Sequence, residues 1–124
     1  MREKLPFDVP EAGRHDVAGV PDGHDAQLVA GIARTRTLNG VLHVARDDLR
    51  MTRMVEALQF VAPDLEVLAF PAWDCLPYDR MGPSAGVAAE RMATLTRLAR
   101  GIDGKKPVLL ITQVPALLQK VPPR

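Results

Sequence analysis

Three short apolar runs, separated by stretches of helical periodicity, most constrain how this chain folds. The runs lie at 40–44, 65–70 and 108–112. Runs this apolar are typical of strands that are buried on both faces, as in a parallel sheet covered by helices. Residues 16–20 form a fourth and weaker candidate strand.

The intervals between these runs carry the spacing of amphipathic helices. Helices are predicted over 24–36, 47–62, 84–100 and 115–120. Asp47 and Ser84 are suited to cap the starts of two of them, and Gly101 is suited to end the 84–100 helix. The side chains expected to be buried are Leu28, Val29, Ile32 and Ala33 in the first helix, Met51, Met54, Val55, Leu58 and Ala62 in the second, and Ala88, Met92, Leu95 and Ala99, with Leu98 beside them, in the third.

This alternation of strands and helices predicts an α/β fold with a mostly parallel sheet flanked by helices. A length of 124 residues suits one domain. We expect residues 1–13 to be a flexible lead-in and 14–124 to form the domain. Functional sites in such folds lie at the carboxyl ends of the strands, which here are followed by the loops 19–25, 45–48 and 71–83.

Composition narrows the functional classes. The net charge of +1 gives no argument for nucleic-acid binding, and the single Cys fits a reducing cytosol. No apolar run approaches the ~20 residues that cross a bilayer, so a cytoplasmic protein without a membrane partner is expected. The three histidines, His15, His24 and His43, are scattered without ligand spacing, which predicts no metal site.

The turn at 19–25 stands where a phosphate-binding loop would lie. Such a loop needs G-x-x-x-x-G-K-[ST], but here Gly19 and Gly23 are one residue too close, and His24 and Asp25 replace the Lys and the Ser or Thr. Pro21 has no N–H to donate to a phosphate. We expect a tight turn and helix start, a degenerate phosphate loop that binds no cofactor.

The loop at 71–83 contains the only Trp and the only Tyr of the chain. Trp73 and Tyr78 could stack on bases while Arg80 contacts a phosphate, but packing of the rings onto the domain is the favoured interpretation. Cys75 has no sequence neighbour that would make it a reactive thiolate, so we expect it to be idle.

The polar face of the 84–100 helix carries Glu90, Arg91, Arg97 and Arg100. A solvated face is the favoured interpretation, and a contact with another domain or a partner is the alternative. Glu90 and Arg91 are adjacent and point apart, so they could tie separate loops to the sheet.

The order of residues in this region resembles the N-terminal part of the bacterial transcription-repair coupling factors (Mfd). The resemblance runs from about 16 to 121 and includes the ending Val108-Leu-Leu-Ile-Thr-Gln-Val-Pro-Ala-Leu-Leu-Gln-Lys120. Its core is Trp73-Asp74-Cys75-Leu76-Pro77-Tyr78-Asp79, then Ser84, and then Glu90-Arg91-Met92-Ala93-Thr94-Leu95. The matched residues Trp73, Leu76, Pro77, Tyr78, Asp79, Arg80, Glu90, Arg91 and Thr94 are the expected family-motif and interdomain residues.

The resemblance implies a degenerate RecA-like, P-loop helicase-type domain, like domain 1a of the excision-repair protein UvrB and incomplete. It implies a non-catalytic scaffold within a large ATP-dependent DNA translocase. That protein displaces stalled RNA polymerase and recruits UvrA to damaged DNA for nucleotide excision repair. ATP and magnesium would bind only in its motor domains, and the partners of this segment would be the rest of the coupling factor.

Two other functional classes stay open at this point. A small doubly wound enzyme would hold an anion at the turn 19–25. A nucleotide- or DNA-binding module would use the loop 71–83, and its affinity would depend on salt.

Overall fold

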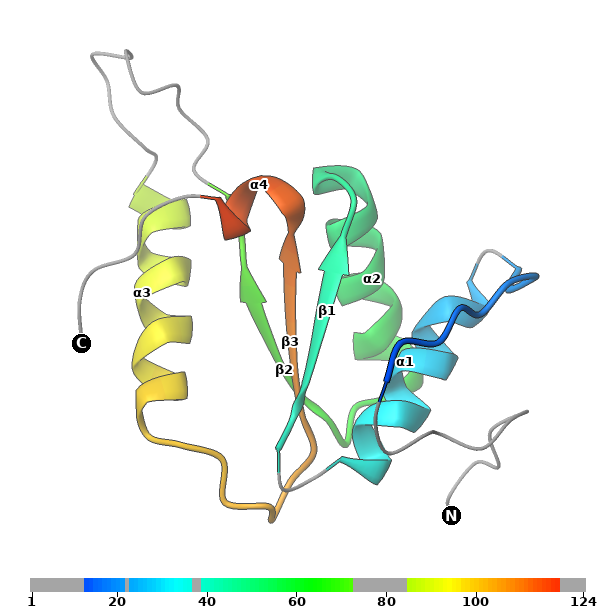
Figure 1. Ribbon diagram of the computed structural model, residues 1–124. Coiled ribbons are helices and arrows are strands. Elements are labelled where there is room, and N and C mark those ends of the chain that lie inside the picture. The colour runs from blue at the N-terminus through cyan, green and yellow to red at the C-terminus, as the bar shows by residue number, and fades with distance from the viewer. Residues whose placement is uncertain (1–12, 22, 37–38, 73–84, 119–124) are drawn as a thin grey trace.

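A parallel sheet lies at the centre of the fold in the computed structural model (Figure 1), which describes residues 13–21, 23–36, 39–72 and 85–118. Its strands within these ranges are β1 (Val41–Ala45), β2 (Glu66–Phe70) and β3 (Val108–Gln113). The strand order is β1-β3-β2, and both pairings are parallel. The predicted α/β class and the three apolar strands are therefore confirmed.

The predicted fourth strand at 16–20 is wrong. Residues 13–21 form no strand and are exposed, and Val17 keeps 50% of its surface accessible. Gly19 adopts a φ of 76°, which breaks an extended conformation. In Figure 1 this segment runs beside the first helix, away from the sheet. Without a neighbouring strand, the few apolar residues of this segment gain no burial.

The described helices are α1 (His24–Thr35), α2 (Asp48–Val61), α3 (Ala85–Ala99) and the short α4 (Val114–Leu117). Asp47 caps α2 as predicted, since its side chain accepts a hydrogen bond from the Arg50 N–H at 2.9 Å. Gly101 follows α3 with a φ of 82°, as expected for a helix-ending glycine. The proposed cap Ser84 and the predicted end of the last helix at Lys120 lie outside the described residues.

The hydrophobic core lies between one face of the sheet and the helices α1 and α2. From the strands it receives Leu109, Ile111 and Ala45, which are all buried. The predicted stripe of α2 is confirmed, because Met51, Met54 and Leu58 are buried and Val55 packs against them. Burial of such side chains is worth about 1.5–3 kcal/mol each, so this layer holds α2 against the sheet.

The buried side of α1 matches the prediction only in part: Ala33 is buried and Val29 packs against the core as predicted. Leu28 and Ile32 are only partly buried, whereas the small residues of the helix are packed inside. The fully buried positions of α1 are Ala26, Ala30, Gly31 and Ala33. Small side chains allow α1 to approach α2 and the sheet closely. The size of the side chains, rather than their hydrophobicity, therefore decides which side of α1 is fully buried.

The buried side of α3 is also not the predicted one. Met92 is 50% exposed and Ala99 is exposed, whereas Arg91 and Thr94 retain only 2% and 4% of their surface. Ala88, Leu95 and Leu98 are partly buried. Two polar side chains, Arg91 and Thr94, are therefore buried where the apolar periodicity predicted Met92 and Ala99 to be buried.

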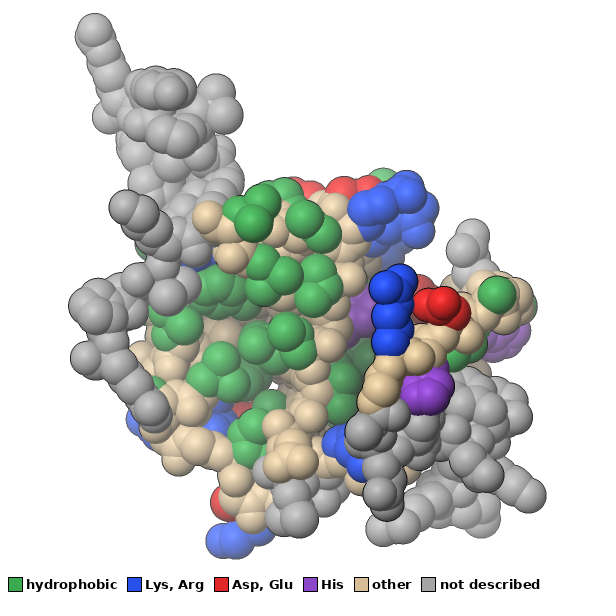
Figure 2. Space-filling model, in the orientation of Figure 1, with side chains coloured by type: hydrophobic (Ala, Val, Ile, Leu, Met, Phe, Trp, Pro, Cys, Tyr) green, Lys and Arg blue, Asp and Glu red, His purple; other side chains and the backbone are tan. Residues whose placement is uncertain are grey.

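The sheet face opposite the core is only partly covered. On this face Leu42, Leu110 and Leu68 lie side by side, because Leu110 pairs in register with both of the others. Leu42 remains 53% exposed and Val44 39% exposed. Figure 2 shows apolar side chains gathered over the front of the sheet and over α4. In the described part of the chain, this is an apolar face with no helix over β1.

None of the helices in the described ranges is long and apolar enough to cross a membrane.

Candidate functional site

The predicted site residues fall into three groups in the structure. The first group lies outside the described residues and consists of Trp73, Cys75, Leu76, Pro77, Tyr78, Asp79 and Arg80. Arg91 and Thr94 face β2, while Glu90 is exposed on the other side of α3. Gly23, His24 and Asp25 form the start of α1, and Gly19 lies in the exposed segment before it.

The junction between α3 and β2 is built on the backbone carbonyls of the strand. The Phe70 carbonyl accepts a hydrogen bond from Thr112 Oγ1 of the neighbouring strand β3 at 2.8 Å. Successive carbonyls of a strand point to alternate sides, so those of Ala69 and Pro71 point to the free edge of β2. Thr94 Oγ1 donates to the Ala69 carbonyl at 2.6 Å, and Arg91 Nη1 donates to the Pro71 carbonyl at 2.6 Å. Helix α3 thus supplies the donors that this sheet edge lacks.

Arg91 is the most buried charged side chain among the described residues. Its guanidinium lies 4.1 Å from the centre of the Phe70 ring, a distance typical of a cation–π contact. Burial lowers the pKa of Arg91 from its ordinary value, because the charged form loses its hydration. The aromatic face and the carbonyl oxygen offset part of that loss.

A second arginine fastens the other end of α3 to the start of β2. Arg97 donates from Nε and Nη2 to the two Glu66 carboxylate oxygens at 2.7 and 2.6 Å. Both side chains are 27% exposed, so the pair is partly shielded from water. The hydrogen bonds to Glu66 raise the pKa of Arg97 above its ordinary value, because the carboxylate stabilises the charged guanidinium. The expectation of a solvated polar face is therefore wrong for Arg91 and Arg97.

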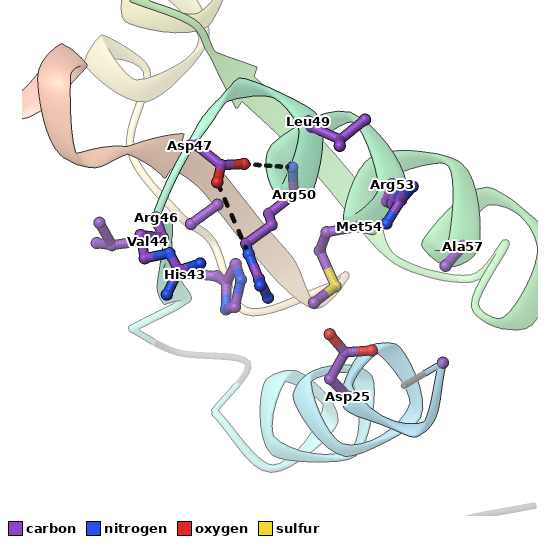
Figure 3. Close-up of a pocket in the computed structure, with 12 residues that line it drawn as sticks. Asp25, His43, Val44, Arg46, Asp47, Leu49, Arg50, Arg53, Met54 and Ala57 are labelled. Atoms are coloured by element: carbon purple, nitrogen blue, oxygen red, sulfur yellow. Dashed lines mark hydrogen bonds and ion pairs between the residues drawn. The ribbon is translucent and has the colours of Figure 1, made fainter. Parts of the chain in front are cut away.

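A different part of the sheet carries a hollow of about 560 Å³. It lies where β1 ends and α2 begins, with the start of α1 opposite (Figure 3). Three arginines line it, Arg46, Arg50 and Arg53, together with His43. Gly23 and Asp25 of the predicted turn line it from α1. The structure thus brings the loops 19–25 and 45–48 together at one strand end.

The charges of the hollow are unevenly neutralised. Arg50 Nε lies 3.7 Å from the Asp47 carboxylate, an exposed pair. Neither Arg46 nor Arg53 has a side-chain hydrogen bond or ion pair with any residue that the structure describes. Burial lowers the pKa of the His43 imidazole, and the nearby Asp25 carboxylate opposes that effect.

The turn before α1 has the geometry of a tight turn that begins a helix. Gly23 is the N-cap with a φ of 90°, and the His24 N–H donates to the Pro21 carbonyl at 3.1 Å. The Asp25 carboxylate accepts from the Ala26 N–H at 2.9 Å. No group of three His, Cys, Asp or Glu residues that could hold a metal is found in the described ranges.

The arginines of the hollow are the residues that sequence reasoning missed. Arg46, Arg50 and Arg53 follow one another at spacings of four and three residues. Arg50 and Arg53 lie three residues apart on one side of α2, whereas Arg46 directly follows β1 and precedes the helix. The pattern was therefore visible in the sequence, but only the packing of α1 shows that the three arginines line a common hollow.

The chain resembles known proteins over much of its length. No protein-family model matches it. It is 36% identical over 92 residues to the transcription-repair-coupling factor of Rickettsia prowazekii, a match that covers 73% of this chain and 8% of that protein. The coupling factor of Rickettsia bellii is 35% identical over 75 residues, covering 56% of this chain and 6% of that protein.

A third relative, the transcription-repair-coupling factor of Rickettsia conorii, is 29% identical over 84 residues. That match covers 68% of this chain and 7% of the relative. The chain thus spans less than a tenth of the length of these curated relatives. It is homologous to a short segment of the transcription-repair-coupling factors, the family that its residue pattern predicted.

Proposed function

We propose that this chain is a non-catalytic scaffold domain in the N-terminal region of a transcription-repair-coupling factor. In this proposal the full-length protein is an ATP-dependent DNA translocase that displaces stalled RNA polymerase and recruits UvrA for nucleotide excision repair. The domain presents the UvrA-binding module and packs against the rest of the polypeptide. The short matched share of the relatives supports a role within a larger protein.

The observation that carries the proposal is the apolar sheet face formed by Leu42, Val44, Leu68 and Leu110. Parallel sheets are ordinarily covered on both faces, yet Leu42 is 53% exposed. The face continues onto α4, where Val114 and Leu117 are 47% and 53% exposed. A contiguous apolar surface of this kind is typical of an interface with another protein or domain, and a neighbouring domain of the coupling factor is the occupant that we propose.

The fastening of α3 supports the same role. Thr94 and Arg91 donate to strand carbonyls and Arg97 donates to the Glu66 carboxylate, and these contacts hold α3 in a fixed geometry against β2. Arg91 also holds Pro71, the residue at which the family-motif loop begins. The 71–83 loop and α3 are therefore the surfaces that we expect to set interdomain geometry.

A titration with ATP and magnesium tests whether the domain is non-catalytic. His24 and Asp25 replace the Lys and the Ser or Thr of a working phosphate loop. We expect no magnesium-dependent ATP binding by calorimetry and no phosphate release at high protein concentration. Magnesium-dependent binding with turnover would overturn the non-catalytic assignment and favour the small-enzyme alternative.

An association experiment tests the scaffold role. The chain would be titrated into a coupling factor from which the matched segment has been deleted, and saturable binding is expected. Leu42→Lys should weaken this binding about tenfold or more, because it places a charge in the apolar contact. Phe60→Lys is the matched control, since Phe60 is an apolar residue 88% exposed on α2. No binding, or equal loss in both variants, would contradict the proposed interface.

A further inference from the structure

The hollow between β1, α1 and α2 is open to solvent and carries basic side chains from two elements. Arg46 follows β1 directly, while Arg50 and Arg53 lie on the first turns of α2. Figure 3 shows Arg50 and His43 projecting into the space between these elements, with Asp25 on the opposite wall. The sheet edge, one helix face and the start of a second helix thus form its walls.

Two of these arginines, Arg46 and Arg53, do not stabilise the fold through side-chain contacts with the described residues. Arg34, Arg91 and Arg97 each bond to a carboxylate or a carbonyl that fixes the fold. Arg46 and Arg53, by contrast, make no side-chain hydrogen bond or ion pair with the described part of the chain. Their fork-shaped donors are left directed to whatever occupies the hollow or to water.

We propose that this hollow is a binding site for a phosphate-bearing anion, held by Arg46 and Arg53 with Arg50 as a third donor. Guanidinium groups match phosphate oxygens in pairs and keep their charge at all physiological pH values. The hollow is open and its arginines are exposed, so the contact is hydrated and its affinity falls as salt rises. This site is separate from the apolar face and does not depend on the scaffold role.

The acidic residues of the hollow set the strength of the site. Asp47 already engages Arg50 at 3.7 Å and also caps α2. Asp25 lies across the hollow, where its charge repels an anion. Removing the Asp25 charge should therefore tighten binding, a gain that a merely structural role for the arginines would not produce.

The phosphate can come from a free polyphosphate or from a nucleic-acid backbone, and two probes distinguish these sources. Inorganic pyrophosphate, without magnesium, is titrated by calorimetry at low salt. A fluorescently labelled single-stranded oligonucleotide is titrated by anisotropy in the same buffer. Binding of pyrophosphate indicates a free anion, and binding of the oligonucleotide alone indicates a backbone phosphate.

The variants decide whether the hollow is responsible. The double variant Arg46→Gln/Arg53→Gln should weaken binding about tenfold, since one exposed charge contact is worth up to about a factor of five. Asp25→Asn should tighten it about two- to fivefold for the same reason. Arg100→Gln, an exposed arginine at the end of α3, is the matched control and should leave affinity unchanged.

Circular dichroism and melting temperature confirm that each variant is folded before binding is compared. The proposal is overturned if neither probe binds, or if the double variant and Arg100→Gln bind equally well. It is also overturned if Asp25→Asn binds more weakly than the unaltered chain while remaining folded, because the carboxylate would then assist the ligand. None of these anion-binding outcomes tests the apolar interface. The anion site can therefore be disproved while the scaffold proposal stands, and the reverse also holds.

Discussion

Individual polar side chains hold α3 in place, and Thr94 shows the principle most simply. Its hydroxyl is buried and donates to the Ala69 carbonyl at 2.6 Å. That carbonyl lies on the free edge of β2, where no strand supplies a donor. A hydroxyl that would be neutral on a solvated helix face therefore becomes a structural contact.

Replacing Thr94 with Val keeps the shape of the side chain and removes the donor. We expect Thr94→Val to lower the free energy of unfolding by about 1–2 kcal/mol, because the Ala69 carbonyl loses its partner in a buried position. Chemical denaturation measures the change. Thr96→Val, two residues along the same helix and exposed, is the control and should change stability by less than about 0.5 kcal/mol.

The imidazole of His43 gives the fold a dependence on pH. Burial lowers its pKa below the ordinary 6.5, so in folded chains the neutral form persists to lower pH than in unfolded chains. The unfolded state then binds the proton first as pH falls. His43 therefore contributes stability that is present above pH 6.5 and is lost as pH falls through its lowered pKa.

Unfolding measured between about pH 7 and pH 5 should accordingly show stability falling with pH. His43→Gln should flatten the slope in this interval, whereas His24→Gln, at the exposed start of α1, should retain it. Equal slopes in His43→Gln and the unaltered chain would contradict this account. The Asp64 carboxylate does not interfere with this measurement. Its hydrogen bond to Arg34 lowers the pKa of Asp64 below 3.8, so Asp64 stays ionised in the folded chain between pH 7 and pH 5.

At the scale of elements, the helices are attached to the sheet by different means. Helix α2 buries large apolar side chains such as Met51, Met54 and Leu58. Helix α1 buries small ones and is tied at its end by Arg34, whose Nη2 lies 2.8 Å from the Asp64 carboxylate. Helix α3 is fastened by polar groups to the edge strand. Each helix therefore tolerates a different kind of substitution.

The close approach of α1 predicts sensitivity to size. Ala30 is 1% exposed, and Ala30→Leu would force added methyl groups into a packed layer. We expect a loss of about 1–3 kcal/mol in the free energy of unfolding. Gln27→Leu adds an apolar side chain to the exposed side of the same helix and should be nearly neutral. If both variants are neutral, the small-residue packing of α1 is not required.

At the scale of the molecule, α1 and α2 cover one sheet face, and among the described residues α3 covers the other face only at the β2 side. The leucines of β1, β3 and β2 are aligned across the uncovered face by the parallel register. Apolar surface exposed in this way favours association whenever a complementary surface is available. In the isolated chain the available surface is the same face of a second copy.

We therefore expect the isolated chain to self-associate at high concentration in sedimentation equilibrium. Leu42→Lys should weaken the association roughly tenfold, because it removes apolar contact area and places a charge in the interface. Phe60→Lys again provides the comparison on the opposite side of the sheet. A chain that stays monomeric at every accessible concentration would count against the exposed face as an interface.

Sequence alone determined three of the four predicted strands, the α2 core stripe and the resemblance to the transcription-repair-coupling factors. Apolar runs bounded by turn residues indicate buried strands almost without reference to context, and the spacing of Met51, Met54 and Leu58 shows which side of α2 is buried. The resemblance to the coupling factors was visible in the order of residues from Trp73 to Leu95, which is a property of the sequence and needs no fold. These features depend on neighbours along the chain.

The tertiary structure alone decided the orientation of α3, the packing side of α1 and the hollow. Apolar periodicity assigned Met92 and Ala99 to the interior, but the partner of α3 is a strand edge whose carbonyls require donors, so Arg91 and Thr94 are buried instead. The arginines line a common hollow only because α1 lies opposite them. Burial and charge depend on what lies opposite in space, and the chain order does not contain that information locally.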